Sequence, residues 1–141
     1  LKIASTDGNV AMIRRLRTLF PDCNILGWVL DEKSAYRWIP IKPTQRRYAV
    51  VVTLDPNKDA ISYLVLIRPT FGARSSVYNY NRRSLMINSI LRYFNVLSSF
   101  YYDDKFGFDL ETSMRSSFLA AIMVHTWIGA VFNFDMVMLS A

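Results

Sequence analysis

The stretch Ser99-Phe-Tyr-Tyr-Asp-Asp-Lys-Phe-Gly-Phe-Asp109 (SFYYDDKFGFD) places two adjacent carboxylates between two aromatic-rich runs. Like-charged neighbours repel and aspartate is a poor strand former, so we expect Asp103 and Asp104 at a turn or a functional site. The flanking runs, residues 96–102 and 106–108, are typical of paired strands. The stretch therefore predicts a β-hairpin whose tip carries the two aspartates.

A third carboxylate ends an earlier apolar run. Residues 24–30 (NILGWVL) have the short, continuous apolar pattern of a buried strand, and Asp31 follows directly. If this strand and the hairpin are neighbours in one sheet, Asp31, Asp103 and Asp104 meet at one edge. A hard divalent cation stabilises such a cluster, and Mg²⁺ prefers carboxylate oxygens, waters and substrate phosphates. Two such ions about 3.5–4 Å apart stabilise the attacking and leaving oxygens of a phosphoryl transfer.

The rest of the chain alternates helical and strand patterns. The pattern predicts helices over residues 10–20, 74–94 and 111–127, a hairpin of residues 48–54 and 61–67 around a turn at 55–59, and a short strand over 130–134 after Gly129. This order favours one α+β domain of two layers, with a mainly antiparallel sheet and helices packed on one face.

The charge of the chain is unevenly distributed. Residues 1–92 hold 15 Lys and Arg against 6 Asp and Glu, whereas residues 93–141 hold 2 against 5. A basic body beside an acidic patch suits a polyanion held near a cation-binding centre, although a solvated basic surface is the alternative. The most apolar run, residues 118–132, is shorter than the ~20 residues that a membrane span requires, so no membrane partner is expected.

The cysteine and histidine content narrows the chemistry further. The single Cys23 excludes an internal disulfide framework, and with one His125 there is no Cys/His zinc site. His125 lies in an apolar helical pattern and is expected to be a buried core residue rather than a ligand. No signal-peptide pattern is present. The sequence leaves the compartment open, with an intracellular location in the nucleus or cytoplasm as the expectation.

Four motifs together resemble reverse transcriptases of the retrotransposon type. Tyr101-Tyr102-Asp103-Asp104 resembles the YxDD box of that family, and residues 30–41 resemble its earlier box, with a catalytic Asp, an aromatic after Ala, and Ile-Pro. Arg46-Arg47-Tyr48 resembles the entry to the next strand, and residues 69–76 (PTFGARSS) resemble the segment that opens the template-contacting helix. The resemblance covers residues 24–110.

The resemblance implies the palm subdomain of an RNA-directed DNA polymerase. Asp31 and Asp103 would bridge two Mg²⁺ ions, with Mn²⁺ as a substitute, and Asp104 would support the ion geometry. The substrates would be deoxynucleoside triphosphates and an RNA or DNA template with its primer. Residues 1–141 would be a partial domain, a palm with a short piece of the preceding fingers. The remaining fingers and the thumb would lie outside it, and the piece alone is expected to be inactive.

The resemblance also implies substrate contacts. Tyr36 would exclude a 2′-hydroxyl from the sugar pocket, with an ordinary core aromatic as the alternative. Phe71 and Gly72 would lie close to the incoming nucleotide and template base, with a plain turn glycine as the alternative. Tyr101 and Tyr102 would also contact substrate. Template phosphates would be bound by the basic face of the second long helix, with a solvated helix face as the alternative; its arginines are Arg74, Arg82, Arg83 and Arg92.

Three departures from the family pattern bear on these roles. Ser76-Val77 stands where Ala-Pro is usual, the bulky Tyr102 fills the variable position of YxDD, and residues 133–136 lack the lysine expected to protonate pyrophosphate. The second hypothesis is a non-catalytic or degenerate nucleic-acid-binding module with a palm-like fold, whose aromatics stack bases. The carboxylate cluster separates the two hypotheses, because a pure binder gains nothing from negative charge on its nucleic-acid face.

Overall fold

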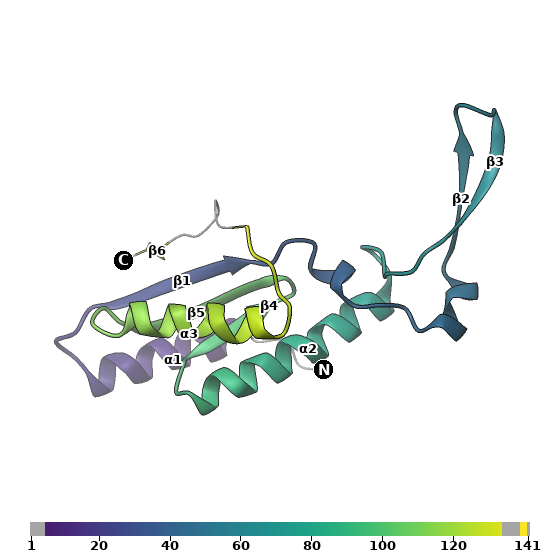
Figure 1. Cartoon of the computed structure of the whole chain (residues 1–141). Coiled ribbons are helices and arrows are strands. Elements are labelled where there is room, and N and C mark those ends of the chain that lie inside the picture. The colour runs from purple at the N-terminus through teal and green to yellow at the C-terminus, as the bar shows by residue number, and fades with distance from the viewer. Residues whose placement is uncertain (1–4, 134–138, 141) are drawn as a thin grey trace.

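A four-stranded antiparallel sheet in the order β4-β5-β1-β6 forms the body of the molecule (Figure 1). Its strands are β1 (Ile25–Asp31), β4 (Ser98–Tyr101), β5 (Asp104–Leu110) and β6 (Leu139–Ser140). The structure is a computed structural model that describes residues 5–133 and 139–140. The predicted early strand and the predicted aspartate-bearing hairpin are both confirmed, and they are neighbours through the pairing of β1 with β5.

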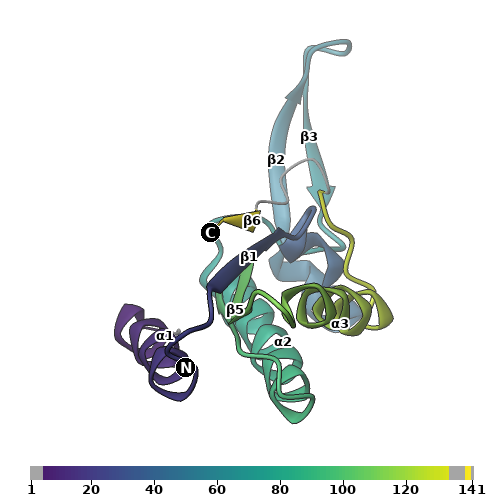
Figure 2. The same cartoon turned by 90° about the vertical axis from the view of Figure 1, so that its left-hand side faces the viewer.

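Three α-helices surround the sheet: α1 (Thr6–Leu19), α2 (Arg74–Tyr93) and α3 (Met114–Trp127). Ser5 caps the start of α1, where its hydroxyl accepts a hydrogen bond from the Gly8 amide. Helices α2 and α3 contact each other and the sheet. Helix α1 contacts β1 and β5 and lies on the other side of the sheet from α3 (Figures 1 and 2). The predicted α+β class, with an antiparallel sheet and helices packed on it, is confirmed. The expectation that all helices pack on one face is wrong, because α1 lies against the face opposite α3.

The main core lies between the sheet and the pair α2 and α3. It is built from buried side chains of β1, α2, α3 and the segments that follow the two helices: Trp28, Leu30, Ile87, Leu91, Val96, Met114, Ala121, Val124, Ala130 and Phe132. Successive strand residues point to opposite faces, so burial of Trp28 and Leu30 on the helix side places Val29 and Asp31 on the other face. The composition of β1 therefore decides which face carries the acidic edge.

Gly107 of β5 is required by close packing. A Cβ atom built at this position would collide with the Trp28 ring and would lie 2.7 Å from the Leu97 carbonyl oxygen. Trp28 is only 1% exposed, so its ring fills the space that a side chain at position 107 would occupy. The glycine of the opening stretch thus allows the largest core residue to pack against the neighbouring strand.

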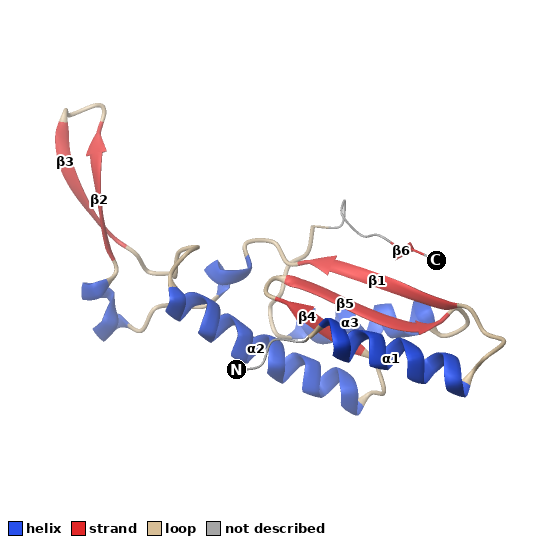
Figure 3. Cartoon of the chain, turned by 180° about the vertical axis from the view of Figure 1, so that it is seen from behind, coloured by secondary structure: helices blue, strands red, loops and turns tan. Residues whose placement is uncertain are grey.

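A second hairpin, β2 (Val50–Asp55) and β3 (Ala60–Val65), projects away from the body (Figure 3). It confirms the hairpin predicted around the turn at residues 55–59. The cross-strand register gathers six exposed apolar side chains on one of its faces: Val50, Val52, Leu54, Ile61, Tyr63 and Val65. Two 3₁₀ helices, η1 (Ala35–Trp38) and η2 (Pro43–Tyr48), connect β1 to this hairpin.

The strand expected over residues 130–134 is not formed within the described part of that segment. Phe132 makes an isolated antiparallel bridge with Glu32, just beyond the end of β1. The segment leaves α3 through Gly129, which has a positive φ of 82°. Phe134 lies outside the described residues. None of the helices in the described ranges is both long enough and apolar enough to cross a membrane.

Candidate functional site

Asp31 and Asp104 lie directly opposite each other in the antiparallel pairing of β1 with β5. Opposite residues of an antiparallel pair have Cβ atoms about 4.5–5.5 Å apart and side chains on the same face. That face is the one turned away from Trp28 and Leu30. The β4–β5 turn places Asp103 immediately before Asp104, which also pairs with Tyr101. The three carboxylate residues predicted to converge are therefore gathered at one end of the sheet.

The electrostatics of the three carboxylates agree with this placement. The pKa of Asp104 is raised, first by burial, then by the negative charges of Asp103 and Asp31, while Lys105 acts in the opposite direction. A like charge raises a carboxyl pKa only when it lies nearby, because repulsion disfavours the ionised form. The site therefore concentrates negative charge that a bound cation would relieve.

The turn that carries Asp103 has a strained backbone. Tyr102 adopts a positive φ of 53°, although it is neither glycine nor asparagine. Such conformations cost on the order of 1–3 kcal/mol, persist only where the surroundings hold them, and cluster at functional sites. The Tyr102 ring packs edge-on against Tyr101, with 4.7 Å between centroids, and Tyr101 is 55% exposed. Both tyrosines thus sit beside the carboxylates, and their contact with substrate stays a prediction.

Asn133 orients the carboxylate of Asp31. Its side-chain amide donates a hydrogen bond of 2.7 Å to Oδ2 of Asp31, and its backbone amide donates one of 3.1 Å to the Asp31 carbonyl. Because these residues are 102 positions apart in the chain, no local pattern indicated the contact. Sequence reasoning had considered Asn133 only as part of a segment without lysine.

Glu32 forms a buried ionic cluster behind the site. Its side chain accepts hydrogen bonds from the Tyr80 hydroxyl and the Arg83 guanidinium, and the residue is 2% exposed. Burial and the charge of Glu32 raise the pKa of Tyr80, so this phenol stays protonated and donates. The cluster joins the end of β1 to the middle of α2.

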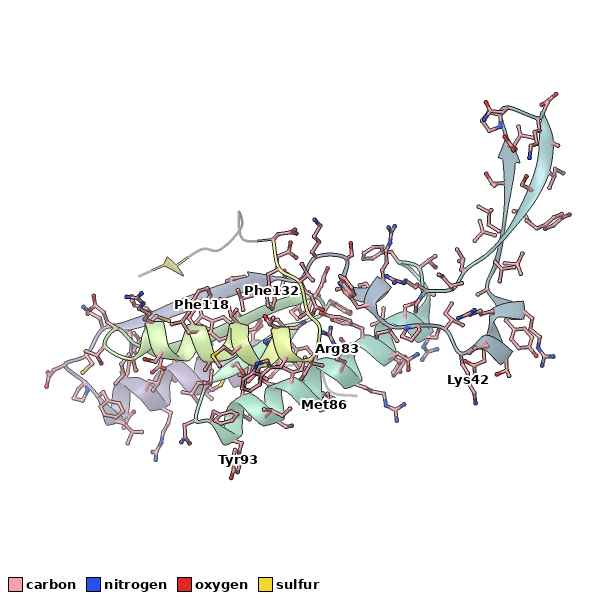
Figure 4. All side chains as sticks on the ribbon, in the orientation of Figure 1. Lys42, Arg83, Met86, Tyr93, Phe118 and Phe132 are labelled. Carbon is pink, nitrogen blue, oxygen red and sulfur yellow. The ribbon has the colours of Figure 1, made fainter. Side chains whose placement is uncertain are left out.

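Arg83 corrects one predicted role. Its side chain is 13% exposed, and its guanidinium binds Glu32 and lies 3.5 Å from the Ile128 carbonyl oxygen. Figure 4 shows it directed toward the segment that follows α3. The prediction that Arg83 contacts template phosphate is wrong, because the group is committed to an internal carboxylate. Arg74 and Arg82 are exposed on α2, as is Arg92, and their predicted role stays a prediction.

Tyr36 lies between the carboxylate turn and the start of α2. It is 7% exposed, and its ring contacts those of Phe71 and Tyr80 at centroid distances of 5.1 and 4.9 Å. Burial raises its pKa, with smaller contributions from Asp103 and Tyr102, which places the phenol near the turn. Tyr36 is thus a packed core aromatic that also adjoins the candidate site.

Phe71 and Gly72 occupy the loop before α2. Phe71 is 57% exposed and reaches Tyr36. Gly72 has a φ of +88°, and no atom lies within 4 Å of a Cβ built there. The glycine is therefore explained by its backbone conformation, which favours a residue without a Cβ, and the close approach of a nucleotide at this position stays a prediction.

Lys105 is a buried cation that sequence reasoning did not identify. It is 3% exposed, and its ammonium donates hydrogen bonds to the Tyr80 hydroxyl and the Tyr102 carbonyl, both at 2.9 Å. Burial lowers its pKa to about 8, against the attraction of Glu32. Strand alternation was the available signal, since Lys105 follows Asp104 and must point to the opposite face.

The donor set fits a hard divalent cation held by few protein ligands. Among the side chains that the structure describes, no three His, Cys, Asp or Glu residues form a preformed metal centre. Asp31 and Asp104 nevertheless stand opposite each other in the sheet, with their side chains on the same face. Mg²⁺ is usually held by one or two carboxylates together with waters and substrate phosphates, so two facing aspartates beside a third suit it.

A cleft of about 660 Å³ opens between η2, the base of the projecting hairpin and the start of α2. Its lining is mixed and includes Lys42, Gln45, Tyr48, Ser75 and Asn79. Figure 4 shows Lys42 at the hairpin end of the molecule, pointing outward. The chain between residues 33 and 54 contains five Lys and Arg and no Asp or Glu, so this region is uniformly basic.

Comparisons with known proteins add no identification. A scan against protein families found no match, and a search of curated proteins found no similar sequence.

Proposed function

We propose that the chain is the palm of an RNA-directed DNA polymerase of the retrotransposon type, which transfers nucleotides with two Mg²⁺ ions. The observation that carries the proposal is the placement of Asp31 opposite Asp104, with Asp103 in the adjoining turn. The order of the motifs along the chain supports it independently. The α+β architecture, an antiparallel sheet with helices packed on it, is compatible with the palm that the resemblance implies.

The aspartates of the site would bind Mg²⁺, and neighbouring residues would hold them in place. Bound Mg²⁺ supplies charge neutralisation at the triphosphate and at the attacking 3′-oxygen. Asp31 and Asp103 would hold the ions, and Asp104 would support their geometry. Asn133 fixes one oxygen of Asp31 through a hydrogen bond of 2.7 Å, which leaves the other oxygen for a cation. The strained turn at Tyr102 holds Asp103 beside this edge.

The nucleic acid would lie along the basic side of the molecule. Arg74 and Arg82 are exposed on α2, and the basic stretch of residues 33–54 contributes Lys42 to the lining of the cleft at the hairpin base. Arginines also stack on exposed tyrosines here, with Arg47 4.8 Å above Tyr48 and Arg74 5.7 Å from Tyr78. Positive charge interleaved with aromatic rings is the surface that single-stranded nucleic acid requires.

The sugar of the incoming nucleotide would be selected at Tyr36. Its position beside the Tyr102–Asp103 turn supports this assignment. A Tyr36→Ala variant is expected to incorporate ribonucleotides more readily. Unchanged discrimination between ribonucleotides and deoxyribonucleotides would assign Tyr36 to packing alone.

The same arginine–tyrosine stacks favour a second candidate, a nucleic-acid-binding module without catalysis. Such a module would bind single-stranded RNA or DNA in the absence of any divalent cation. It would also tolerate the loss of Asp31, since a carboxylate opposes binding to a polyanion.

Primer extension distinguishes the two. A longer chain, in which the expected fingers and thumb are added to residues 1–141, is incubated with a primed RNA template, deoxynucleoside triphosphates and Mg²⁺. We expect extension by the native sequence, its loss in Asp31→Asn, and its retention in Asp22→Asn, which removes an exposed carboxylate ahead of β1. Template binding with no extension, unaffected by Asp31→Asn, would favour the binding module and overturn the polymerase.

A further inference from the structure

The side chain of Lys105 is buried directly behind the turn that carries the aspartates. Lys105 follows Asp104 in β5, yet strand alternation sends it to the opposite face, where it is 3% exposed. Its ammonium lies 4.6 Å from the centroid of the Tyr80 ring and 5.8 Å from that of Phe100. Lysine is almost never buried to this degree without a specific set of partners.

The partners of Lys105 are the backbone of the turn and one tyrosine. The ammonium donates to the carbonyl oxygens of Tyr102 at 2.9 Å and Asp103 at 3.3 Å, and to the Tyr80 hydroxyl at 2.9 Å. An ammonium has three donors, so all of them are used. Both residues at the centre of the two-residue turn are thus tied to one buried group.

The turn requires such a tie because its backbone is strained. In a two-residue hairpin turn the positive φ of the first central residue is normally supplied by glycine, asparagine or aspartate, whereas here Tyr102 holds it at 53°. Strained conformations relax unless neighbouring contacts hold them. The hydrogen bonds from Lys105 act on the carbonyls of Tyr102 and Asp103, the two residues whose backbone defines the turn.

The anchor continues into α2. Tyr80, which accepts from Lys105, donates its own proton to Glu32, and Glu32 is also bound by Arg83. The turn, the end of β1 and the middle of α2 are therefore connected by one continuous set of hydrogen bonds. The end of β1 and the turn beside Asp31 and Asp104 are thus held from the α2 side of the sheet.

We propose that Lys105 is a positioning residue, which fixes the turn bearing Asp103 and Asp104 in the geometry that binds a divalent cation. The proposal rests on the proposed function, because only a cation site gives the geometry of these carboxylates a purpose. Electrostatics alone predicts the opposite effect, since a positive charge beside the site repels a cation. Substitution of Lys105 therefore weakens cation binding if the residue positions the turn, and strengthens cation binding if only its charge matters.

Calorimetric titration of the whole chain with Mn²⁺ tests whether substitution of Lys105 weakens or strengthens cation binding. We expect Lys105→Met to bind Mn²⁺ about tenfold more weakly than the native sequence, the loss typical of residues that orient metal ligands. Lys33→Met is the matched control, since it removes an exposed positive charge two residues from Asp31; it is expected to bind as tightly as the native sequence or tighter. Tighter binding by Lys105→Met would overturn the proposal.

A second substitution, Tyr102→Gly, tests whether Lys105 affects Mn²⁺ binding by holding the strained turn. Tyr102→Gly removes the strain, so adding Lys105→Met to Tyr102→Gly is expected to weaken Mn²⁺ binding by a much smaller factor than in the native background. An equal loss in both backgrounds would contradict positioning through the turn. If Lys105→Met does not fold, Lys105→Gln replaces it in both backgrounds; it is expected to bind more weakly than the native sequence, and native affinity would overturn the proposal.

Hydrogen exchange supplies a readout that needs no cation. Lys105→Met is expected to speed amide exchange at Asp103 and Asp104 about tenfold, with no change at the Asp59 turn of the other hairpin. Unchanged exchange overturns the positioning role whatever the cation result. A native chain that binds no Mn²⁺, but shows this faster exchange in the variant, refutes the proposed function and leaves the anchoring of the turn standing.

Discussion

Asp31 and Glu32 are consecutive residues whose carboxylates lie on opposite sides of the sheet. Asp31 lies opposite Asp104 on the face turned away from α2 and α3, whereas Glu32 is buried against Tyr80 and Arg83 of α2. Strand alternation alone produces this separation. One carboxylate is thereby available for chemistry, and its neighbour anchors the strand to the helix below.

Because Arg83 is paired with the buried Glu32, substitution of Arg83 is expected to lower the stability of the fold far more than substitution of its neighbour Arg82. Arg83→Met leaves the Glu32 charge buried without its cationic partner and is expected to destabilise the fold by about 3–5 kcal/mol. Arg82→Met, one position away on an exposed surface, is expected to change stability by less than about 0.5 kcal/mol. Urea unfolding of the two variants measures the difference, and equal effects would contradict the assignment of Arg83 to the interior.

The proximity of Asp31 and Asp104 predicts a coupled titration. Asp31→Asn removes one of the negative charges that raise the pKa of Asp104, so that pKa is expected to fall. Carbon NMR of the carboxyl groups follows the titration directly. Asp22→Asn, in the exposed loop before β1, is the control and is expected to leave Asp104 unchanged. A pKa of Asp104 that does not respond to position 31 would place the two carboxylates apart.

His125 predicts a loss of stability in acid. Its Nδ1 lies 2.7 Å from the Ala121 carbonyl oxygen, and burial lowers its pKa to about 4 from a model-peptide value of 6.5. Between pH 6.5 and 4, His125 is therefore protonated in the unfolded chain but stays neutral in the folded chain. Stability contributed by the neutral ring is full above pH 6.5 and declines by about 3 kcal/mol as the pH falls to 4.

The control for this effect is His125→Leu, which cannot titrate. We expect the difference in unfolding free energy between the native sequence and this variant to depend on pH over this range and to be flat above pH 7. A difference that is constant from pH 4 to 7 would show that the histidine is accessible to protons in the fold.

Alanine substitutions at two glycines on neighbouring strands, Gly107 of β5 and Gly27 of β1, are expected to differ in their effect on stability. Gly107→Ala would drive a methyl group into the Trp28 ring and the Leu97 carbonyl, and it is expected to cost at least about 1–3 kcal/mol. Gly27→Ala meets nothing closer than 3.6 Å and is expected to be nearly neutral. Thermal unfolding compares them, and a tolerated alanine at position 107 would mean that Trp28 is packed less tightly than the structure has it.

Local patterns were sufficient for the elements that build the acidic edge. The apolar run before Asp31 and the aromatic runs around Asp103 and Asp104 each indicate a strand by composition, and antiparallel pairing then brings their ends together. The two basic positions Arg82 and Arg83 show where this reasoning stops. Consecutive helix residues lie about 100° apart, and which one turns inward depends on Glu32, 51 positions away in sequence.

Contacts between distant segments explain the other differences. Asn133 reaches Asp31 only because the segment after α3 crosses the end of β1, where Phe132 bridges to Glu32. The same single bridge replaces the strand expected over residues 130–134. Tyr48, predicted to begin a strand, instead ends the 3₁₀ helix η2 that Pro43 begins, because proline fixes a φ suited to a helical first turn.

Paramagnetic line broadening by Mn²⁺ tests most directly whether the three carboxylates share a divalent cation. Substoichiometric Mn²⁺ is added to the isotopically labelled chain, and amide signals are followed by NMR. We expect broadening centred on Asp31, Asp103 and Asp104 that is lost in Asp31→Asn. Broadening centred instead on Asp55 and Asp59 of the projecting hairpin, or spread evenly over the acidic residues, would contradict a cation site at this edge of the sheet.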